Sequence, residues 1–204
     1  MHDPRSALLQ HNCGHWQGLF IRMGADGLEE TRFSTTLDVS EQSGLIQTSL
    51  TYLESGQQRS MNFRELPHTM QVSATGGWSL GPGSITPFGW VGEMCVVSGT
   101  QRRRIVVRHG PSGLDQVVYV IETMGIHPPS PPQAPVQCQI EDLGTWRIWR
   151  PESDVELLLD ARHRVSGQAT LCGMRWVEPN GDQQQIVRRY DSNGMLLPLT
   201  SSWP

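Results

Sequence analysis

The sequence contains no lysine, so all 16 of its strongly basic residues are arginines. Against 20 acidic residues this gives a formal net charge of −4. The chain therefore lacks the positive field that draws a protein to nucleic acid or to an anionic membrane surface. A biased genomic base composition would explain the missing lysines. The alternative is that several arginines make planar, bidentate contacts to carboxylates or phosphates, which lysine cannot make.

Long hydrophobic runs and secretion signals are also missing. No apolar run approaches the roughly 18 residues that a membrane-spanning helix needs, and residues 1–10 lack the apolar core of a signal peptide. The four cysteines, Cys13, Cys95, Cys138 and Cys172, form no C-x-x-C pair, which argues against a zinc ribbon or a redox motif. We expect free, mostly buried thiols in a soluble, cytoplasmic protein with no membrane span and no nucleic-acid partner.

The motifs of common enzymes are absent as well. There is no G-x-S-x-G nucleophile, no phosphate-binding G-x-x-x-x-G-K-[ST] loop and no dinucleotide-binding G-x-G-x-x-G before a helix. His11 and His15 are four residues apart, but a strand follows them, so we expect no metal site. With no acid–base pair to name, no catalytic residue is predicted. If the protein is an enzyme, we expect a chromophore lyase-like or a cyclase activity.

What the chain does contain is alternation of apolar and polar residues, punctuated by glycine and proline turns. The predicted strands are residues 37–39, 45–53, 94–97, 104–108, 116–122, 144–149, 155–159, 169–177, 184–190 and 195–200. One short helix is predicted over residues 4–10, with Asp3 as its N-cap and Pro4 in the first turn. Turns every 8–12 residues are typical of a β-sandwich or β-barrel.

A segment with five prolines in nine residues, 127–135, divides the chain. It predicts an extended polyproline connector, or alternatively a ligand for a proline-binding domain, between residues 1–126 and 136–204. The second part offers about five strands, too few for an eight-stranded barrel. It therefore either shares one core with the first part or forms a shortened second barrel packed against it.

Each part opens with Gly-x-Trp, at Gly14–Trp16 and Gly144–Trp146, an echo that indicates a weak internal duplication or a coincidence. The stretch from Asn12 to Arg22 resembles the first strand of calycin barrels, the superfamily of lipocalins and fatty-acid-binding proteins. There the tryptophan closes one barrel end and an arginine from a late strand packs over it. This resemblance implies Arg104 or Arg108 over Trp16, and Arg188 or Arg189 over Trp146.

More narrowly, residues 14–18, 102–108 and 186–194 resemble the cyanobacterial lipocalin-like proteins of the domain of unknown function 3598 family. The implied architecture is all-β: an antiparallel calycin-like barrel with a second β segment after the proline-rich linker. Calycin relatives include phycobilin lyases, which bind a linear tetrapyrrole and transfer it to a phycobiliprotein. By that analogy a bilin or another tetrapyrrole is the candidate cofactor, and the candidate partner is a phycobiliprotein or a photosynthetic assembly partner.

The leading hypothesis is therefore a barrel that binds an apolar or amphipathic small molecule bearing a carboxylate. Arginines would pair with the carboxylate and tryptophans would pack against the apolar part, although the same residues would also suit a barrel core and its plug. The predicted ligand-binding residues are Trp16, Arg22, Trp90, Arg104, Trp176 and Arg188.

The alternative hypothesis is an assembly factor or scaffold that binds a protein. Trp78 and Trp90 flank a glycine- and proline-rich stretch that resembles a mobile lid or an exposed contact loop, and they are the predicted partner-binding residues. The run Arg102-Arg103-Arg104 is either a patch for an acidic partner or a solvated strand edge.

Overall fold

The computed structural model describes residues 3–87, 89–178, 180–200 and 202–203. Within them the chain forms one helix and fourteen strands. These are α1 (Pro4–Asn12), β1 (Gly14–Gly24), β2 (Glu29–Gln42), β3 (Leu45–Tyr52), β4 (Gln58–Phe63), β5 (Gln71–Val72), β6 (Trp78–Leu80), β7 (Trp90–Ser98), β8 (Gln101–Gly110), β9 (Gly113–Met124), β10 (Gln139–Leu143), β11 (Trp146–Glu152), β12 (Val155–Asp160), β13 (Thr170–Val177) and β14 (Gln183–Tyr190). The prediction of an all-β protein is confirmed.

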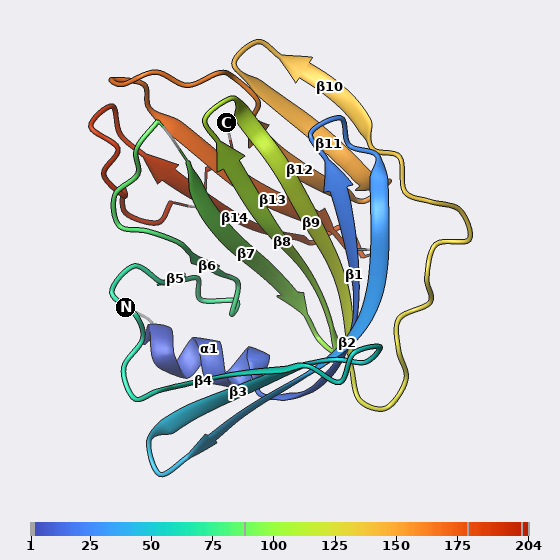
Figure 1. Ribbon diagram of the computed structural model, residues 1–204. Helices are drawn as coiled ribbons and strands as arrows, with labels where there is room; N and C mark the ends of the chain where they lie inside the picture. The colour runs from blue at the N-terminus through green and yellow to red at the C-terminus, as the bar shows by residue number, and fades with distance from the viewer. Residues whose placement is uncertain (1–2, 88, 179, 201, 204) are drawn as a thin grey trace.

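Nine strands form one antiparallel sheet in the order β4-β3-β2-β1-β9-β8-β7-β6-β5. The sheet curls into a half-barrel, with β1, β9, β8 and β7 along its middle (Figure 1). β4 and β5 are its two edges, and α1 lies against β5 and β2 on the concave side. The curled sheet is open along this side, where the helix covers part of it.

The remaining strands form a second antiparallel sheet in the order β10-β11-β12-β13-β14. It packs on β7, β8 and β9 through one continuous hydrophobic cluster to which both sheets contribute. Alternation sorts the side chains, because successive residues of a strand point to opposite faces. In β1, Ile21 and Met23 face the second sheet, and Trp16 and Phe20 face the concave side.

The helix forms where its capping residues predict it. The Asp3 carboxylate accepts hydrogen bonds from the backbone N–H groups of Arg5 and Ser6, and Pro4 occupies the first turn, where no N–H is required. The helix runs two residues further than predicted. The Asn12 amide at its end donates to the Leu8 and Gly76 carbonyls, so this helix end is tied to the loop before β6.

The proline-rich connector is held against the first sheet. Arg32 of β2 donates to the carbonyls of Pro132 and Ala134, and the same guanidinium forms a bidentate pair with Glu29. The Glu29 carboxylate in turn accepts from the Val136 N–H at 2.7 Å. This arginine–carboxylate fork therefore fixes where the chain leaves one sheet and enters the other.

Three details differ from the sequence-based expectations. Residues 195–200 form no strand; they are held by isolated bridges such as Tyr190 to Leu196. Arg102, Arg103 and Arg104 form neither an exposed patch nor a solvated edge, because β8 lies between β7 and β9 and all three side chains are buried. Trp90 lies in the core between the sheets rather than in an exposed loop.

In the part of the chain described, no helix is long and apolar enough to cross a membrane.

Candidate ligand-binding cavity

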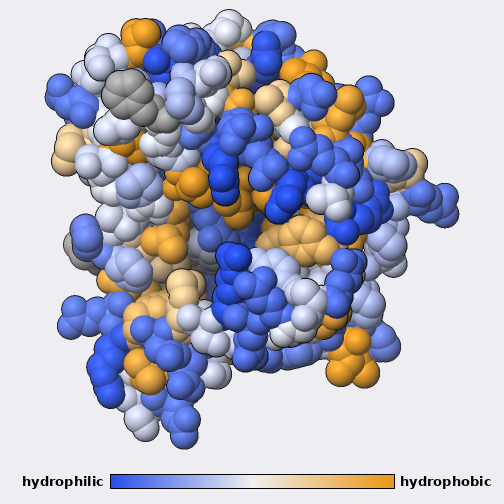
Figure 2. Space-filling view, in the orientation of Figure 1, coloured by the Kyte–Doolittle hydropathy of each residue, from blue (hydrophilic) through white to orange (hydrophobic). Residues whose placement is uncertain are grey.

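The concave side of the curled sheet encloses a cavity of about 530 Å³. The space-filling view shows this face of the molecule hollowed near its centre, with hydrophobic and hydrophilic residues both at the rim (Figure 2). The lining comes from α1, from β2, β3 and β4, and from β6, β7 and β8. Its apolar members are Leu8, Leu37, Val39, Ile46, Leu50, Met61, Phe63, Pro67, Met70, Trp78 and Leu80. The volume falls within the roughly 300–1,000 Å³ of small-molecule sites.

One wall of the cavity carries a buried network of charges. Arg102 donates to both oxygens of Glu122, at 2.7 and 3.1 Å, and Arg104 donates to Glu122 at 3.1 Å and to Glu93 at 2.5 Å. Glu122 is fully buried. Burial alone would raise the pKa of its carboxyl group, but Arg102 and Arg104 together hold that pKa below its usual value. Two cations and two anions make the network neutral.

Alternation along β8 explains why these groups converge. Arg102 and Arg104 lie on the concave face, whereas Arg103 points to the second sheet, where it forms a fork with Glu152 and stacks over Trp176 at 4.6 Å. Arg102 faces Glu122 directly in the β8–β9 pairing. Two of the three successive arginines therefore lie on the concave face of the first sheet, and the middle one lies between the two sheets.

Trp16 lies behind this network, fully buried, and donates from its indole N–H to the Asn12 carbonyl at 2.9 Å. A late-strand arginine does pack over it, as the calycin resemblance implied. It is Arg102, at 4.1 Å from the ring centroid, rather than Arg104 or Arg108. The expected pairing of Trp146 with Arg188 or Arg189 is replaced in the same way, by Arg162 at 5.0 Å.

The cavity opens beside β4, because three of its four exposed lining residues, Arg59, Ser60 and Met61, belong to that edge strand, and the fourth, Pro67, follows it in the chain. The Arg59 guanidinium lies 5.5 Å from the Tyr52 ring centroid. Among the described residues it forms no ion pair. It is thus an uncompensated positive charge at the mouth of a largely apolar cavity.

The structure does not bring all the predicted ligand-binding residues together. Arg104 lines the cavity and Trp16 lies behind its wall. Arg22 is exposed, on the same face of β1 as Phe20, outside the cavity lining. Trp90 and Trp176 lie in the core between the sheets, where Trp90 stacks on His109 at 4.6 Å. Of the two predicted partner-binding residues, Trp78 is half-buried and lines the cavity.

Arg188, also predicted to bind ligand, is fully buried outside the cavity lining and holds neighbouring segments together through hydrogen bonds. It donates to the Thr69 carbonyl at 2.9 Å, the Pro82 carbonyl at 2.8 Å and the Tyr190 hydroxyl at 2.7 Å. It also reaches the Ser79 hydroxyl, at 3.3 Å. A side chain of β14 therefore holds the segment that carries β5 and β6, which form part of the cavity wall.

Asn12, Arg59, Glu93, Arg102 and Glu122 belong to the site and were not among the predicted residues. Arg102 carried a usable signal, since alternation places it on the same face as Arg104. Glu122 carried a weaker one: it ends a predicted strand, and a carboxylate buried on such a strand requires a cationic partner.

The buried thiols offer no reactive group to the cavity. Cys95, Cys138 and Cys172 are free and buried, as expected from the sequence. Burial raises the pKa of the Cys95 thiol to about 12, so it stays protonated at neutral pH. The described residues also contain no group of three or more His, Cys, Asp or Glu side chains placed to hold a metal ion.

With fold and cavity defined, the chain is an antiparallel half-barrel backed by a second sheet, with an internal cavity on its concave side. No family model matches the sequence, and no curated protein does. Its structure is similar to that of a protein with unknown function from the DUF3598 family of Nostoc punctiforme PCC 73102. The TM-score is 0.77 over 98% of this chain and 97% of that one, at 15% sequence identity. This likeness shows a shared fold and extends to no activity.

Proposed function

We propose that this protein binds a small amphipathic molecule in the cavity, with the apolar part inside and a carboxylate at the mouth beside Arg59. The observation that carries the proposal is a cavity of about 530 Å³ whose apolar lining is incompletely covered. Leu37, Val39 and Leu50, among others, are only partly buried. Covering such side chains with an apolar ligand is favourable by roughly 25 cal/mol per Å² of apolar surface removed from water.

The charge balance supports one carboxylate rather than several. Arg102 and Arg104 are already neutralised by Glu93 and Glu122. A ligand carboxylate next to them would have to displace an existing buried carboxylate, which is unfavourable. Arg59 carries no such partner within the described residues, so its guanidinium is the group available to a ligand anion.

A bilin, the ligand class suggested by the resemblance to phycobilin lyases, carries two propionates. Among the described lining residues, Arg59 is the one arginine without an ion pair, and this favours a monocarboxylate amphiphile over a bilin. The two classes are separable by direct titration, and a bilin that bound more tightly than a fatty acid would refute this choice of ligand.

The test is a titration followed by intrinsic tryptophan fluorescence, since Trp78 lines the cavity. The ligands are a long-chain fatty acid, the alcohol of the same chain length, biliverdin and a carotenoid. We expect saturable quenching by the fatty acid, with an affinity about tenfold higher than for the alcohol, as for one charge-assisted hydrogen bond. No saturable response to any of the four ligands would refute binding in the cavity.

Matched variants locate the site. Arg59→Gln should remove the preference for the acid over the alcohol, whereas Arg22→Gln, an exposed arginine outside the lining, should leave it unchanged. Leu50→Trp should fill the cavity and weaken both ligands. A circular dichroism spectrum like that of the parent protein would show that this variant still folds. Equal effects of Arg59→Gln and Arg22→Gln would contradict the assignment of the mouth.

A further inference from the structure

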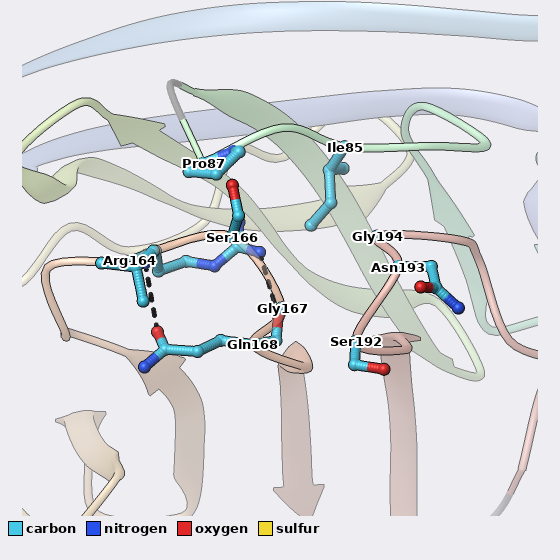
Figure 3. A pocket seen from close by; sticks show the side chains of 10 residues that line it. Ile85, Pro87, Arg164, Ser166, Gly167, Gln168, Ser192, Asn193 and Gly194 are labelled. Carbon is cyan, nitrogen blue, oxygen red and sulfur yellow. Dashed lines mark hydrogen bonds between the residues drawn. The ribbon is translucent and has the colours of Figure 1, made fainter.

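A second, smaller pocket lies among the loops at the far end of the second sheet. It has a volume of about 90 Å³ and is bordered by residues 164–168, which connect β12 to β13, and by residues 192–194, which follow β14. Ile85 and Pro87 border it from a third loop. Figure 3 shows the first two loops facing each other beneath Ile85 and Pro87, with the Arg164 side chain running along the first of them.

Arg164 is unusual among the buried arginines. Five arginines are buried: Arg102, Arg103, Arg104, Arg164 and Arg188. The first three pair with carboxylates, and Arg188 donates to carbonyl and hydroxyl oxygens. Arg164 is only 6% exposed, and its Nε and Nη1 atoms have no partner among the described residues. Within the described part of the chain, its guanidinium makes one hydrogen bond, a long one of 3.4 Å from Nη2 to the Gln168 carbonyl.

Asp160 acts on Arg164 electrostatically but forms no ion pair with it, because this carboxylate is already occupied. Asp160 is fully buried and accepts from Arg162 at 2.7 and 2.8 Å and from the Thr170 hydroxyl at 2.7 Å. Arg162 thereby neutralises Asp160. An arginine side chain stays protonated in proteins, so Arg164 leaves one positive charge uncompensated in a place that water barely reaches.

The pocket beside it has the composition of an anion site. Its lining includes the polar residues Ser166, Gln168, Ser192 and Asn193, and none of the described lining residues is acidic. A volume of 90 Å³ corresponds to about three water molecules, which suits a small oxyanion and is too small for an amphipathic ligand of the main cavity.

We infer that this pocket binds a small oxyanion, a phosphate or a carboxylate group, through the guanidinium of Arg164. The ligand would accept from the unpartnered N–H groups of the arginine, the arrangement that makes arginine a preferred anion partner. The turn at residues 192–194 borders the pocket from the opposite side. The site is independent of the main cavity.

The direct test is the ¹H–¹⁵N spectrum of the arginine Nε–H groups while the protein is titrated with inorganic phosphate, with acetate in a parallel series, at constant ionic strength in sodium chloride. We expect a saturable shift of the Arg164 signal, assigned by its loss in Arg164→Gln. The Arg147 signal, from an exposed arginine paired with Asp142, should shift only weakly and without saturation. Binding of phosphate alone or of acetate alone would tell which oxyanion class the pocket takes.

Thermal unfolding provides a second measurement that does not depend on the assignment. Phosphate or acetate should raise the midpoint for the wild type in a concentration-dependent way and leave Arg164→Gln unchanged. Arg164→Lys keeps the charge but loses the planar fork, and should bind about tenfold more weakly. The inference is overturned if the Arg164 signal moves with neither anion, or if Arg164→Gln gains as much stability from them as the wild type does.

Discussion

Glu122→Gln is the substitution that most directly tests the charge network in the cavity wall. The change keeps the shape of the side chain and removes one negative charge from a cluster of two arginines and two glutamates. Three hydrogen bonds to arginine donors, at 2.7, 3.1 and 3.1 Å, lose their ionic character. A cluster that was neutral, and of which only Glu93 is partly exposed, would then carry a net charge of +1.

Breaking a buried ion pair by removing one partner costs about 3–5 kcal/mol. The glutamine oxygen still accepts one or two of the arginine hydrogen bonds, so we expect a loss near the lower end, about 3 kcal/mol. That is a large part of the 5–15 kcal/mol typical of a folded domain. The assay is urea unfolding followed by far-ultraviolet circular dichroism, with an unchanged m-value as evidence that the folded state is intact.

Two companion measurements make the interpretation specific. In the double variant Arg102→Met with Glu122→Leu, one cation and one anion leave together, so the loss should be smaller than the sum of the two single losses. The arginines lower the pKa of Glu122 in the folded protein, so its stabilising effect is present above the unfolded value of about 4.3 and is lost as the pH falls. Glu122→Gln should therefore lose less stability than the wild type on acidification. A loss under about 1 kcal/mol at neutral pH, or strictly additive effects in the double variant, would refute the reasoning.

Three further predictions concern the core. Arg188→Met should cost about 3 kcal/mol in urea unfolding, because it removes the guanidinium donor from the Thr69 carbonyl and leaves the Pro82 carbonyl with only the Tyr190 hydroxyl as its donor. It should also speed amide exchange around β5 and β6, and unchanged exchange there would contradict the role of Arg188 in holding this segment. Burial lowers the pKa of His109 to about 4. As the pH falls from about 6.5 to about 4, the unfolded chain therefore takes up a proton that the folded protein does not, and the free energy of unfolding falls by up to about 3 kcal/mol. His109→Phe, which keeps a ring stacked on Trp90, should abolish this pH dependence, and its persistence in the variant would show that other groups cause it. Gly18→Ala should lower the free energy of unfolding by about 1–3 kcal/mol, because the new Cβ would lie 2.6 Å from the Thr35 hydroxyl and 3.3 Å from Cγ of Glu122. An unchanged melting temperature would mean that both neighbours shift freely.

The strands that can be read from the sequence are those with an apolar face on the core. β8, β9, β12 and β13 alternate or run apolar because they pack between the sheets. β4 was missed because it is an exposed edge strand in which only Met61 and Phe63 alternate with polar residues. It is defined by its pairing with β3, a contact that local sequence does not encode.

The charge network was missed for a more specific reason. The β8–β9 hairpin turns between Gly110 and Gly113, and simple continuation of that register would place Arg102 opposite Ile121. A bulge between Arg108 and His109 shifts the pairing by one residue, so that Arg102 faces Glu122 instead. A one-residue shift moves side chains to the opposite face of a partner strand. The partner of Arg102 therefore depends on a local irregularity that the pattern of residues does not reveal.

The buried arginines make contacts that lysine could not make in their place. Lysine presents a compact charge, whereas the planar guanidinium satisfies several acceptors at once. Arg102 uses this to span both oxygens of Glu122, and Arg103 to span both of Glu152. Arg188 uses it to reach four oxygens with no carboxylate among them. The other buried arginines are paired with carboxylates or bonded to several oxygens, although Nε of Arg104 has no partner among the described residues. Arg164 differs because both its Nε and its Nη1 lack a partner and no carboxylate is paired with it, which is why we infer for it a partner from outside the chain.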